Sequence, residues 1–390
     1  MREVQLLDGR RVDVACAGPL ISEIGAHLDL TAPVEIDCGG GLATRPFTEP
    51  HLHLDKAGTA DRLPAGASTI GDAIAAMQSV KVTERDNVAA VAARMHRVLN
   101  RIVDDGSHAI RALVDVDEVW GLTAFHAAQQ VQAALAPRAV VQIVAFPQHG
   151  LTPQVLAMLE QAAAEGAGAL GAHTDVDPDP AAHVGAVAAI AAGASLPLEV
   201  HTDEGASPDK FYLPAVLEVL DRFPGLSTTL AHCLSLGTIA PKQQQHWIEE
   251  LAHRDIKVCV APSILGFGLP LAPVRALIEA GVGILVGSDN LQDVFFPLGT
   301  GRAIENVRLL ATAAQLTAPE LAGPLIAGVT DIAYATVTGA ADALAVESPA
   351  TLVVHDATSP AELLRGIDGT RITVIDGLLT SPLQLDKGIK

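Results

Sequence analysis

Eight short apolar runs, rich in Val and Ile, divide the middle of the chain between residues 47 and 342. Each run is followed by an Ala-rich stretch whose apolar residues recur with helical spacing. The runs comprise residues 47–54, 110–116, 140–146, 169–172, 196–201, 227–233, 257–264 and 282–287. Strands that are buried on both faces read as continuous apolar runs, so this rhythm predicts the eight parallel strands of a (β/α)8 TIM barrel. A doubly wound open sheet is the alternative.

The two ends of the chain have a different texture, with short alternating segments separated by turn residues. The expected strands are residues 3–7, 12–16, 21–24 and 34–38 at the start of the chain, and 350–355 and 371–375 near its end. Asp8-Gly9 and Asp376-Gly377 supply matching tight turns. We therefore expect a small β-sandwich domain built from residues 1–46 and 343–390, with residues 47–342 as the catalytic barrel domain.

Composition narrows the choice of partner. The 390 residues are 49% hydrophobic and carry a net charge of −20. Nucleic acids and anionic membrane surfaces require clustered Lys and Arg, so we expect neither as a partner and expect a small molecule instead. The four cysteines form no CxxC pair, and no apolar signal segment or run of about 18 apolar residues is visible, which predicts free thiols in a cytoplasmic protein. Ala-rich surface helices are compatible with a homo-oligomer.

Polar side chains gather where the predicted strands end. His51 and His53 lie two apart in an extended run, so both imidazoles face the same side. Similar residues end four further runs, namely Gln148 and His149, then His201, Asp203 and Glu204, then His232, and finally Ser288, Asp289 and Asn290. One histidine at a strand end is usually a hydrogen-bonded core residue, but the C-terminal ends of barrel strands meet at one rim, where active sites lie. The five strand ends together predict a metal-centred site.

These residues, together with the segments 144–148, 200–204 and 297–300, resemble the amidohydrolase superfamily, and within it the cytosine deaminase branch with its relatives that act on creatinine-like and triazine rings. The resemblance extends over nearly the whole chain. It implies one divalent metal ion, Zn or Fe, held by His51, His53, His201 and Asp289, with a bound hydroxide as nucleophile. It also implies that Asp289 acts as the base, that His232 steadies the tetrahedral intermediate and that Glu204 shuttles the proton.

The expected metal number follows from the fourth predicted strand. Binuclear members of the superfamily carry a bridging carboxylated lysine there, whereas this run ends Gly171-Ala172-His173-Thr174. We therefore expect a single metal ion. Lys56 follows the His pair closely, and we expect it to pair with Asp55 or to reach a substrate oxygen rather than to bridge metals. Imidazole and carboxylate ligands suit both Zn and Fe, so the choice between them stays open.

Departures from the branch bear on the substrate. Asn290 follows Asp289 where the branch typically has a second aspartate, Phe295 replaces a common tryptophan, and His149 follows Gln148 where a small or acidic residue is usual. Gln148 offers the donor and the acceptor that an amide edge of a ring requires. We expect Gln148, His149, Asn290 and Phe295 to bind substrate, and we leave open whether His173 and Asp175 enter the pocket.

The predicted function is hydrolytic deamination of a small nitrogen heterocycle such as a cytosine-like pyrimidine, although the departures point away from cytosine itself. The alternative is hydrolysis of a cyclic amide or imide at the same metal site. A catalytically silent metal-binding protein is a third reading, and it would predict a broken set of ligands.

Overall fold

A computed structural model describes residues 1–65, 69–136, 138–366 and 369–380. Its centre is one sheet of eight parallel strands whose spatial order follows the sequence order. The strands are β5 (Phe47–His53), β6 (Ser107–Asp115), β7 (Val140–Phe146), β8 (Ala169–His173), β9 (Leu198–Thr202), β10 (Thr228–His232), β11 (Lys257–Val260) and β12 (Ile284–Val286).

Backbone hydrogen bonds close this sheet into a barrel. Asp289 N donates to His51 O, and His53 N donates to Asp289 O, both at 2.8 Å. These bonds join the end of the last strand to the first. The predicted TIM barrel is therefore confirmed, and the doubly wound alternative is wrong.

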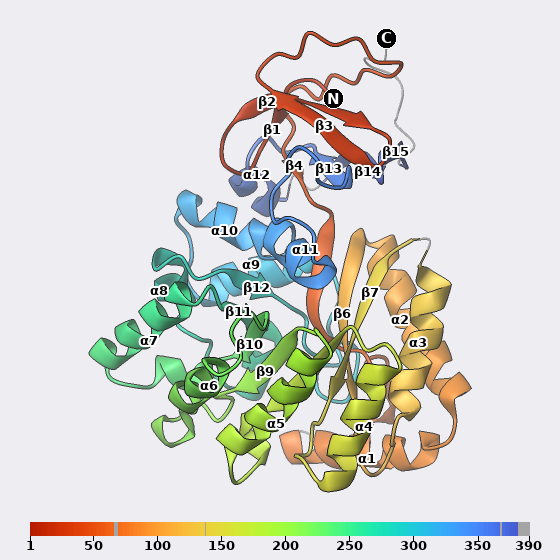
Figure 1. Ribbon diagram of the computed structural model, residues 1–390, viewed down its shortest axis with the longest axis vertical. Helices are drawn as coiled ribbons and strands as arrows, with labels where there is room; N and C mark the ends of the chain where they lie inside the picture. Colours follow the sequence, from red (N-terminus) through yellow and green to blue (C-terminus); the bar gives the residue numbers. More distant parts are fainter. Residues whose placement is uncertain (66–68, 137, 367–368, 381–390) are drawn as a thin grey trace.

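Helices surround the barrel (Figure 1). They are α1 (Ile70–Glu84), α2 (Val88–Asp104), α3 (Thr123–Leu135), α4 (Pro153–Ala164), α5 (Pro180–Gly193), α6 (Leu213–Leu220), α7 (Pro241–His253), α8 (Val274–Glu279), α9 (Ala303–Ala313), α10 (Ala322–Ala327) and α11 (Asp331–Thr338). On α2, Val91, Met95, Leu99 and Ile102 are buried at helical spacing, which explains why this segment packs one face on the strands.

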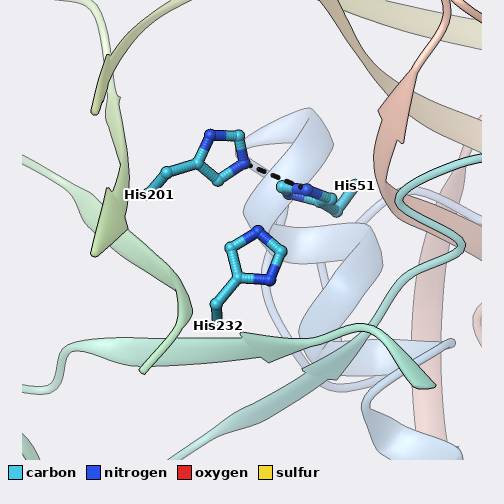
Figure 2. Close-up of side chains that lie close together, drawn as sticks. All are labelled: His51, His201 and His232. Carbon is cyan, nitrogen blue, oxygen red and sulfur yellow. Dashed lines mark hydrogen bonds between the residues drawn. The ribbon is translucent and has the colours of Figure 1, made fainter. Parts of the chain in front are cut away.

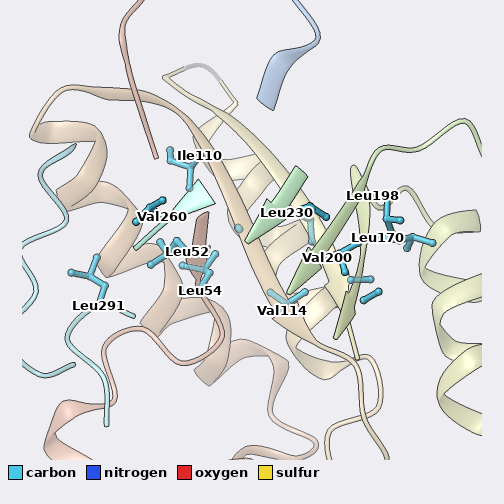
Figure 3. Close-up of a cluster of buried hydrophobic side chains, with 14 of the residues drawn as sticks. Leu52, Leu54, Ile110, Val114, Leu170, Leu198, Val200, Leu230, Val260 and Leu291 are labelled. Atoms are coloured by element: carbon cyan, nitrogen blue, oxygen red, sulfur yellow. The ribbon is translucent and has the colours of Figure 1, made fainter. Parts of the chain in front are cut away.

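The main apolar core lies between the strands and these helices. Figure 3 shows strand side chains of this core, among them Leu52, Val114, Val200 and Leu230. The interior of the barrel is different, because apolar groups such as Leu113 are accompanied there by buried charged side chains. This polar interior leads directly to the strand ends that carry the predicted site.

The seventh strand is shorter than predicted. The expected run 257–264 ends as a strand at Val260 and continues as the 3-10 helix η5 (Pro262–Phe267). Pro262 has no backbone N–H to donate to a neighbouring strand, so the ladder stops before it.

The chain ends form two small sheets at one end of the molecule (Figure 1). One contains β1 (Val4–Gln5), β2 (Arg11–Ala17) and β3 (Leu20–Gly25), and the other contains β4 (Ala43–Thr44), β13 (Leu352–His355), β14 (Thr370–Ile375) and β15 (Leu378–Leu379). One apolar cluster takes side chains from both, including Val14, Ile21, Leu352 and Val354. The division into domains at residues 46 and 343 stays a prediction, and its last ten residues, 381–390, lie outside the described residues.

The predicted strand at residues 34–38 is wrong. Among the described residues that segment forms an isolated bridge between Asp37 and Arg2 and no strand, with Arg2 N donating to Ile36 O at 2.7 Å and Cys38 N donating to Arg2 O at 3.0 Å. The alternation of Val34 with its neighbours suggested a strand, but Val34 is exposed. The short pairing partner leaves no room for a longer ladder.

One helical stretch of the described chain, Pro319–Thr338, is long and apolar enough to cross a membrane by length and composition alone. Its mean hydropathy is 1.3, and 61% of its most apolar window is buried inside the protein. Proline, glycine and threonine residues interrupt it, which is why no such run was visible in the sequence. A mostly buried core helix passes the same test.

Candidate metal centre and active site

The strand ends bring the predicted metal ligands together. His51 and His53 come from β5, His201 from β9, and Asp289 follows β12. His51 Nε2 lies 3.2 Å from His201 Nε2, and Asp289 Oδ1 lies 3.4 Å from His51 Nε2 and 3.3 Å from His53 Nε2. His232, at the end of β10, completes the group, and Figure 2 shows how it converges with His51 and His201. All five side chains are buried.

This arrangement fits a divalent cation. One potential ligand atom from each of His51, His201 and His232 lies within 4.8 Å of the others, and the same holds for His51, His53 and Asp289. Burial lowers the pKa of both His53 and His201 well below the usual value for an imidazole. The positive charge of Lys56 adds to this effect at His53, and the charge of His51 adds to it at His201. Both imidazoles are therefore neutral and present lone pairs, as metal binding requires.

The backbone is strained where the site residues leave their strands. His232 has φ 73°, Asp203 has φ 63° and Asp289 has φ 60°, a left-handed conformation that non-glycine residues adopt at a cost of roughly 1–3 kcal/mol each. For His232 the reason is visible. Ala231 packs inside the barrel, so strand alternation alone would direct His232 outward, and the turn redirects it to the rim.

Glu199 supports His51 from inside the barrel and is not among the residues predicted for the site. Its Oε1 lies 2.5 Å from His51 Nδ1, and its Oε2 accepts from Arg111 Nη1 at 3.1 Å. Both charged side chains are buried. Burial would lower the pKa of His51, but the carboxylates of Glu199 and Asp289 raise it to about 10. The site therefore attracts positive charge. The available signal was a charge two residues before His201 in an apolar strand, and therefore on the same face.

Glu49 fixes the junction between the first and last strands. Its Oε1 accepts from His51 N at 3.1 Å and Ser288 N at 3.0 Å, and its Oε2 accepts from Ser288 Oγ at 2.5 Å. Gly287 is required beside it, because a Cβ there would lie 2.7 Å from His51 Cβ and 2.9 Å from His51 O. The pairing sets the direction in which His51 and Asp289 enter the rim.

We expect Glu199→Gln to weaken metal binding by about 10–100-fold, the usual range for the loss of a carboxylate that orients a ligating histidine. Gln keeps the size of the side chain but removes the charge that holds the Nδ1–H of His51. Competition of the purified protein with a chromogenic chelator measures the affinity. An affinity equal to that of the wild type would show that Glu199 serves only the fold.

Glu204 lies beside the cluster on its accessible side. Its Oε1 lies 3.3 Å from His232 Nε2 and 3.6 Å from His173 Nε2, and 33% of its side chain is exposed. Burial would raise the pKa of Glu204, but His232 and His173 lower it to about 2, so the carboxylate is ionised at neutral pH. His173 thus belongs to the site. Asp175 instead accepts from Glu204 N and Gly205 N, at 3.2 and 3.1 Å, and shapes the loop.

Gln148 and His149 differ in their surroundings. Gln148 Oε1 accepts from Lys56 Nζ at 3.3 Å, and its Nε2 lies 3.4 Å from His173 Nδ1, so this amide faces the site. His149 is an exposed residue whose Nε2 lies 3.0 Å from Gln78 Nε2 on α1. That nitrogen is therefore already engaged within the protein.

Lys56 has more partners than predicted. Its Nζ lies 3.6 Å from Asp55 Oδ1, the expected pair, but it donates to Asp115 Oδ1 at 2.9 Å and lies 3.0 Å from His53 Nδ1. Asp115 ends β6 and was not expected at the site. Lys56 therefore links a predicted metal ligand with Gln148.

Asn290 and Phe295 belong to one loop that Asp293 organises. Asn290 Nδ2 donates to Asp293 Oδ2 at 2.9 Å, and the backbone N–H of Phe295 donates to Asp293 Oδ1 at 2.9 Å. Asn290 is buried, and Phe295 is half-buried and packs against the main core. The loop thus holds both predicted substrate-binding residues in place after the last strand.

A cavity of about 890 Å³ opens at the other end of the barrel, where the strands begin. Residues that precede or start strands line it, such as Leu196, Ser227, Thr228 and Lys257. Among the described residues, none of the clusters that could hold a metal ion contributes a side chain to its wall. Size alone therefore does not locate the site, and the chemistry of the side chains does.

Comparison with known proteins gives relatives along most of the chain, although no family model matches. The uncharacterized protein YahJ of Escherichia coli K12 is 28% identical over 324 residues, which cover 79% of this chain and 66% of YahJ. A pterin deaminase of Rhizobium rhizogenes is 27% identical over 403 residues, covering 96% of this chain and 90% of that enzyme.

Solved structures show the same fold. The 5-methylcytosine deaminase of Klebsiella pneumoniae, bound to 5-fluorocytosine, superposes with a TM-score of 0.86 at 21% identity, covering 99% of this chain and 98% of that one. The N-isopropylammelide isopropylaminohydrolase of Burkholderia multivorans gives 0.80 at 25% identity, with coverage of 97% and 96%. An atrazine chlorohydrolase of Arthrobacter aurescens, complexed with zinc, gives 0.72 at 17% identity, with coverage of 97% and 94%.

Proposed function

This chain belongs to the amidohydrolase superfamily, in its cytosine deaminase-like branch, and from this premise we propose that it removes an amine hydrolytically from a small nitrogen heterocycle. It is a hydrolase of carbon–nitrogen bonds. The observation that carries the deaminase proposal is the position of Glu204, an ionised carboxylate 3.3 Å from His232 and beside the histidine cluster. An amine leaves a ring only when it receives a proton, and Glu204 is placed to deliver one.

His51, His53, His201 and Asp289 would hold one divalent ion, Zn or Fe. The facing imidazole nitrogens and the carboxylate oxygen between them support this set. When bound, such an ion lowers the pKa of a coordinated water from 15.7 to about 7. The fourth strand ends in His173 and carries no lysine at its end, which supports a single ion.

The remaining chemistry is proton transfer by side chains of this chain. Asp289 accepts a proton from the attacking water, and His232 donates a hydrogen bond to the developing oxyanion. The attacking water gives up two protons in all. Glu204, ionised at rest, carries one of them to a ring nitrogen, and the one accepted by Asp289 passes to the leaving amine with the help of Glu204. Gln148, held by Lys56, orients the amide edge of the ring.

The substrate is proposed as an aminated ring that carries an amide-like edge, such as a pyrimidine, a triazine or a pterin. Two relatives named for heterocyclic amines support this class, the pterin deaminase and the isopropylammelide enzyme. Asn290 and Phe295 would line the ring pocket together with Gln148. His149 would contact the substrate from the edge of the pocket that lies next to α1. A cytoplasmic location, the absence of nucleic-acid and membrane partners, and a homo-oligomer remain predictions of the sequence.

The second candidate is hydrolysis of a cyclic amide or imide at the same metal centre. Both reactions need an activated water, but ring opening releases no free amine. Glu204 favours deamination, because a proton donor that faces the pocket serves an exocyclic leaving group.

We expect the purified, metal-loaded protein to release ammonia or an alkylamine from at least one ring among cytosine, isocytosine, creatinine, aminotriazines and pterins. A strong chelator should abolish this release, and added Zn or Fe should restore it, because the water loses its activation without the ion. Coupled detection of the released amine, with cyclic amides as parallel substrates, makes the measurement. Consumption of cyclic amides alone, without any amine, would move the reaction to the second candidate.

A further inference from the structure

Lys81 is a buried charged residue that the proposed mechanism does not use. It lies on α1, and its Nζ donates to Asp115 Oδ2 and to Asp117 Oδ2, both at 2.5 Å. The ring of Trp120 lies 5.5 Å from the same ammonium. Burial opposes the charge, but the two carboxylates raise the pKa of Lys81 above its usual value. Lys81 is therefore an internal cation enclosed by two aspartates.

The carboxylate of Asp115 is shared with a second lysine. While Oδ2 accepts from Lys81, Oδ1 accepts from Lys56 Nζ at 2.9 Å. The same Lys56 ammonium lies 3.0 Å from His53 Nδ1 and 3.3 Å from Gln148 Oε1. Two side chains, Asp115 and Lys56, thus connect Lys81 on α1 with a proposed metal ligand and with the proposed substrate-binding amide.

A second route joins α1 to the same strand end. His149, the residue after Gln148, has its Nε2 3.0 Å from Gln78 Nε2 and 3.4 Å from Lys81 Nζ. Gln78 and Lys81 are three apart on α1 and so neighbours on one side of the helix. In Figure 1, α1 lies at the end of the barrel away from the small sheets formed by the chain ends.

Charge balance tells what Lys81 does there. Two lysines, Lys56 and Lys81, neutralise most of the charge of Asp55, Asp115 and Asp117 in a buried site. Without Lys81, Asp115 Oδ2 and Asp117 Oδ2 lose their cation, while Lys56 stays paired with the other oxygen of Asp115. Because an unpaired buried carboxylate is costly, Lys56 is drawn towards these oxygens and away from Gln148.

We propose that Lys81 is a positioning residue for substrate binding, which holds Lys56 on Gln148 through the shared carboxylate of Asp115 and holds His149 directly. This inference rests on the proposed function, because it gives Gln148 the role of binding the ring. Lys81 acts on substrate binding rather than on the chemical step. Its loss therefore raises KM and leaves the turnover of bound substrate nearly unchanged.

The test compares Lys81→Met with two matched variants. Lys81→Arg keeps the charge and should restore binding. Glu84 lies one turn further along α1, where its Oε2 pairs with Arg94 Nη2 at 2.7 Å. Glu84→Gln therefore breaks a different buried ion pair of the same helix. If Lys81 merely docked α1, both neutral variants would have the same effect.

We expect Lys81→Met to raise KM by about tenfold or more, with kcat per bound metal within about threefold of the wild type. The Kd of the deaminated product, measured by calorimetry, should rise by the same factor. Lys81→Arg should recover most of the loss, and Glu84→Gln should leave KM within about twofold even where its melting temperature falls. Equal KM changes for Lys81→Met and Glu84→Gln would overturn the proposal. If Lys81→Met fails to fold, Lys81→Gln carries the same expectations with a polar side chain.

A crystal structure of the Lys81→Met protein provides a readout that needs no substrate. Lys56 Nζ should move beyond hydrogen-bond distance of Gln148 Oε1, while the pair is unchanged in Glu84→Gln. An unchanged contact between Lys56 and Gln148 in Lys81→Met overturns the proposal whatever reaction the protein catalyses. Conversely, a wild-type protein that releases no amine from any ring refutes the proposed function and leaves this structural comparison decisive for Lys81.

Discussion

Replacement of Asp289 by asparagine is expected to lower turnover by about 10³-fold or more. Asp289 Oδ1 lies within 3.4 Å of the Nε2 atoms of His51 and His53, and in the proposed mechanism it contributes negative charge to the metal and accepts the proton of water. Loss of a general base alone costs roughly 10²–10⁴-fold. Asparagine has nearly the same shape but can do neither. Steady-state amine release, with metal content measured on the same samples, tests this result.

A matched control is Asp331→Asn. Asp331 is another buried aspartate, whose Oδ2 accepts from Arg45 N at 3.2 Å, far from the strand ends that carry the metal centre. It should keep turnover within about twofold, because the side-chain oxygen of asparagine can still accept from Arg45 N and the change lies outside the proposed site. An Asp289→Asn protein that retains more than a tenth of the wild-type rate with a full complement of metal would refute the role of Asp289 as base.

Glu204→Gln is expected to lower kcat by about 10²–10⁴-fold while the metal stays bound. The side chain approaches His232 and His173 but belongs to neither proposed ligand set. The pKa of Glu204 is lowered to about 2. A carboxyl group whose pKa is lowered in this way is ionised at every pH above that value, so the resting enzyme holds the proton-accepting form of Glu204. The loss should therefore extend over the whole range from about pH 5 to 9 rather than over one limb of the profile.

The control for this prediction is Glu165→Gln, a glutamate at the exposed end of α4 that pairs with His126. Its kcat should equal that of the wild type. If Glu204→Gln kept more than a third of the wild-type kcat, the proton would travel by another route. Loss of the metal together with activity in Glu204→Gln would instead make Glu204 a ligand.

Much of the fold could be predicted from the sequence, because barrel strands that are buried on both faces are continuous runs of apolar residues. The run at residues 140–146 coincides with β7, and the runs around His51 and His201 lie within a few residues of β5 and β9. Errors occurred where pairing, not composition, decides. Residues 34–38 alternate as a strand does, yet within the described part of the chain they form isolated bridging and no strand. The seventh run stops as a strand at Val260, before Pro262.

The proposed metal ligands could be predicted from the sequence, whereas the buried charged side chains that support them could not. The proposed metal ligands end predicted strands, and the parallel order of a barrel brings such ends together. Glu199, Arg111 and Lys81 gave no comparable signal. A charged residue such as Glu199 in an apolar strand indicates the face on which it lies but not its partner, and here the partners belong to other strands or helices.

The sequence by itself determined the barrel, the rim and the chemical types gathered there, because strand periodicity and strand order are local properties that repeat along the chain. Only the tertiary structure decided how these groups are oriented. The left-handed turn at His232, the carboxylate behind His51 and the lysine pair around Asp115 depend on side chains that meet across the barrel. Such contacts follow from packing in three dimensions, where residues far apart in the chain compete for the same buried partner.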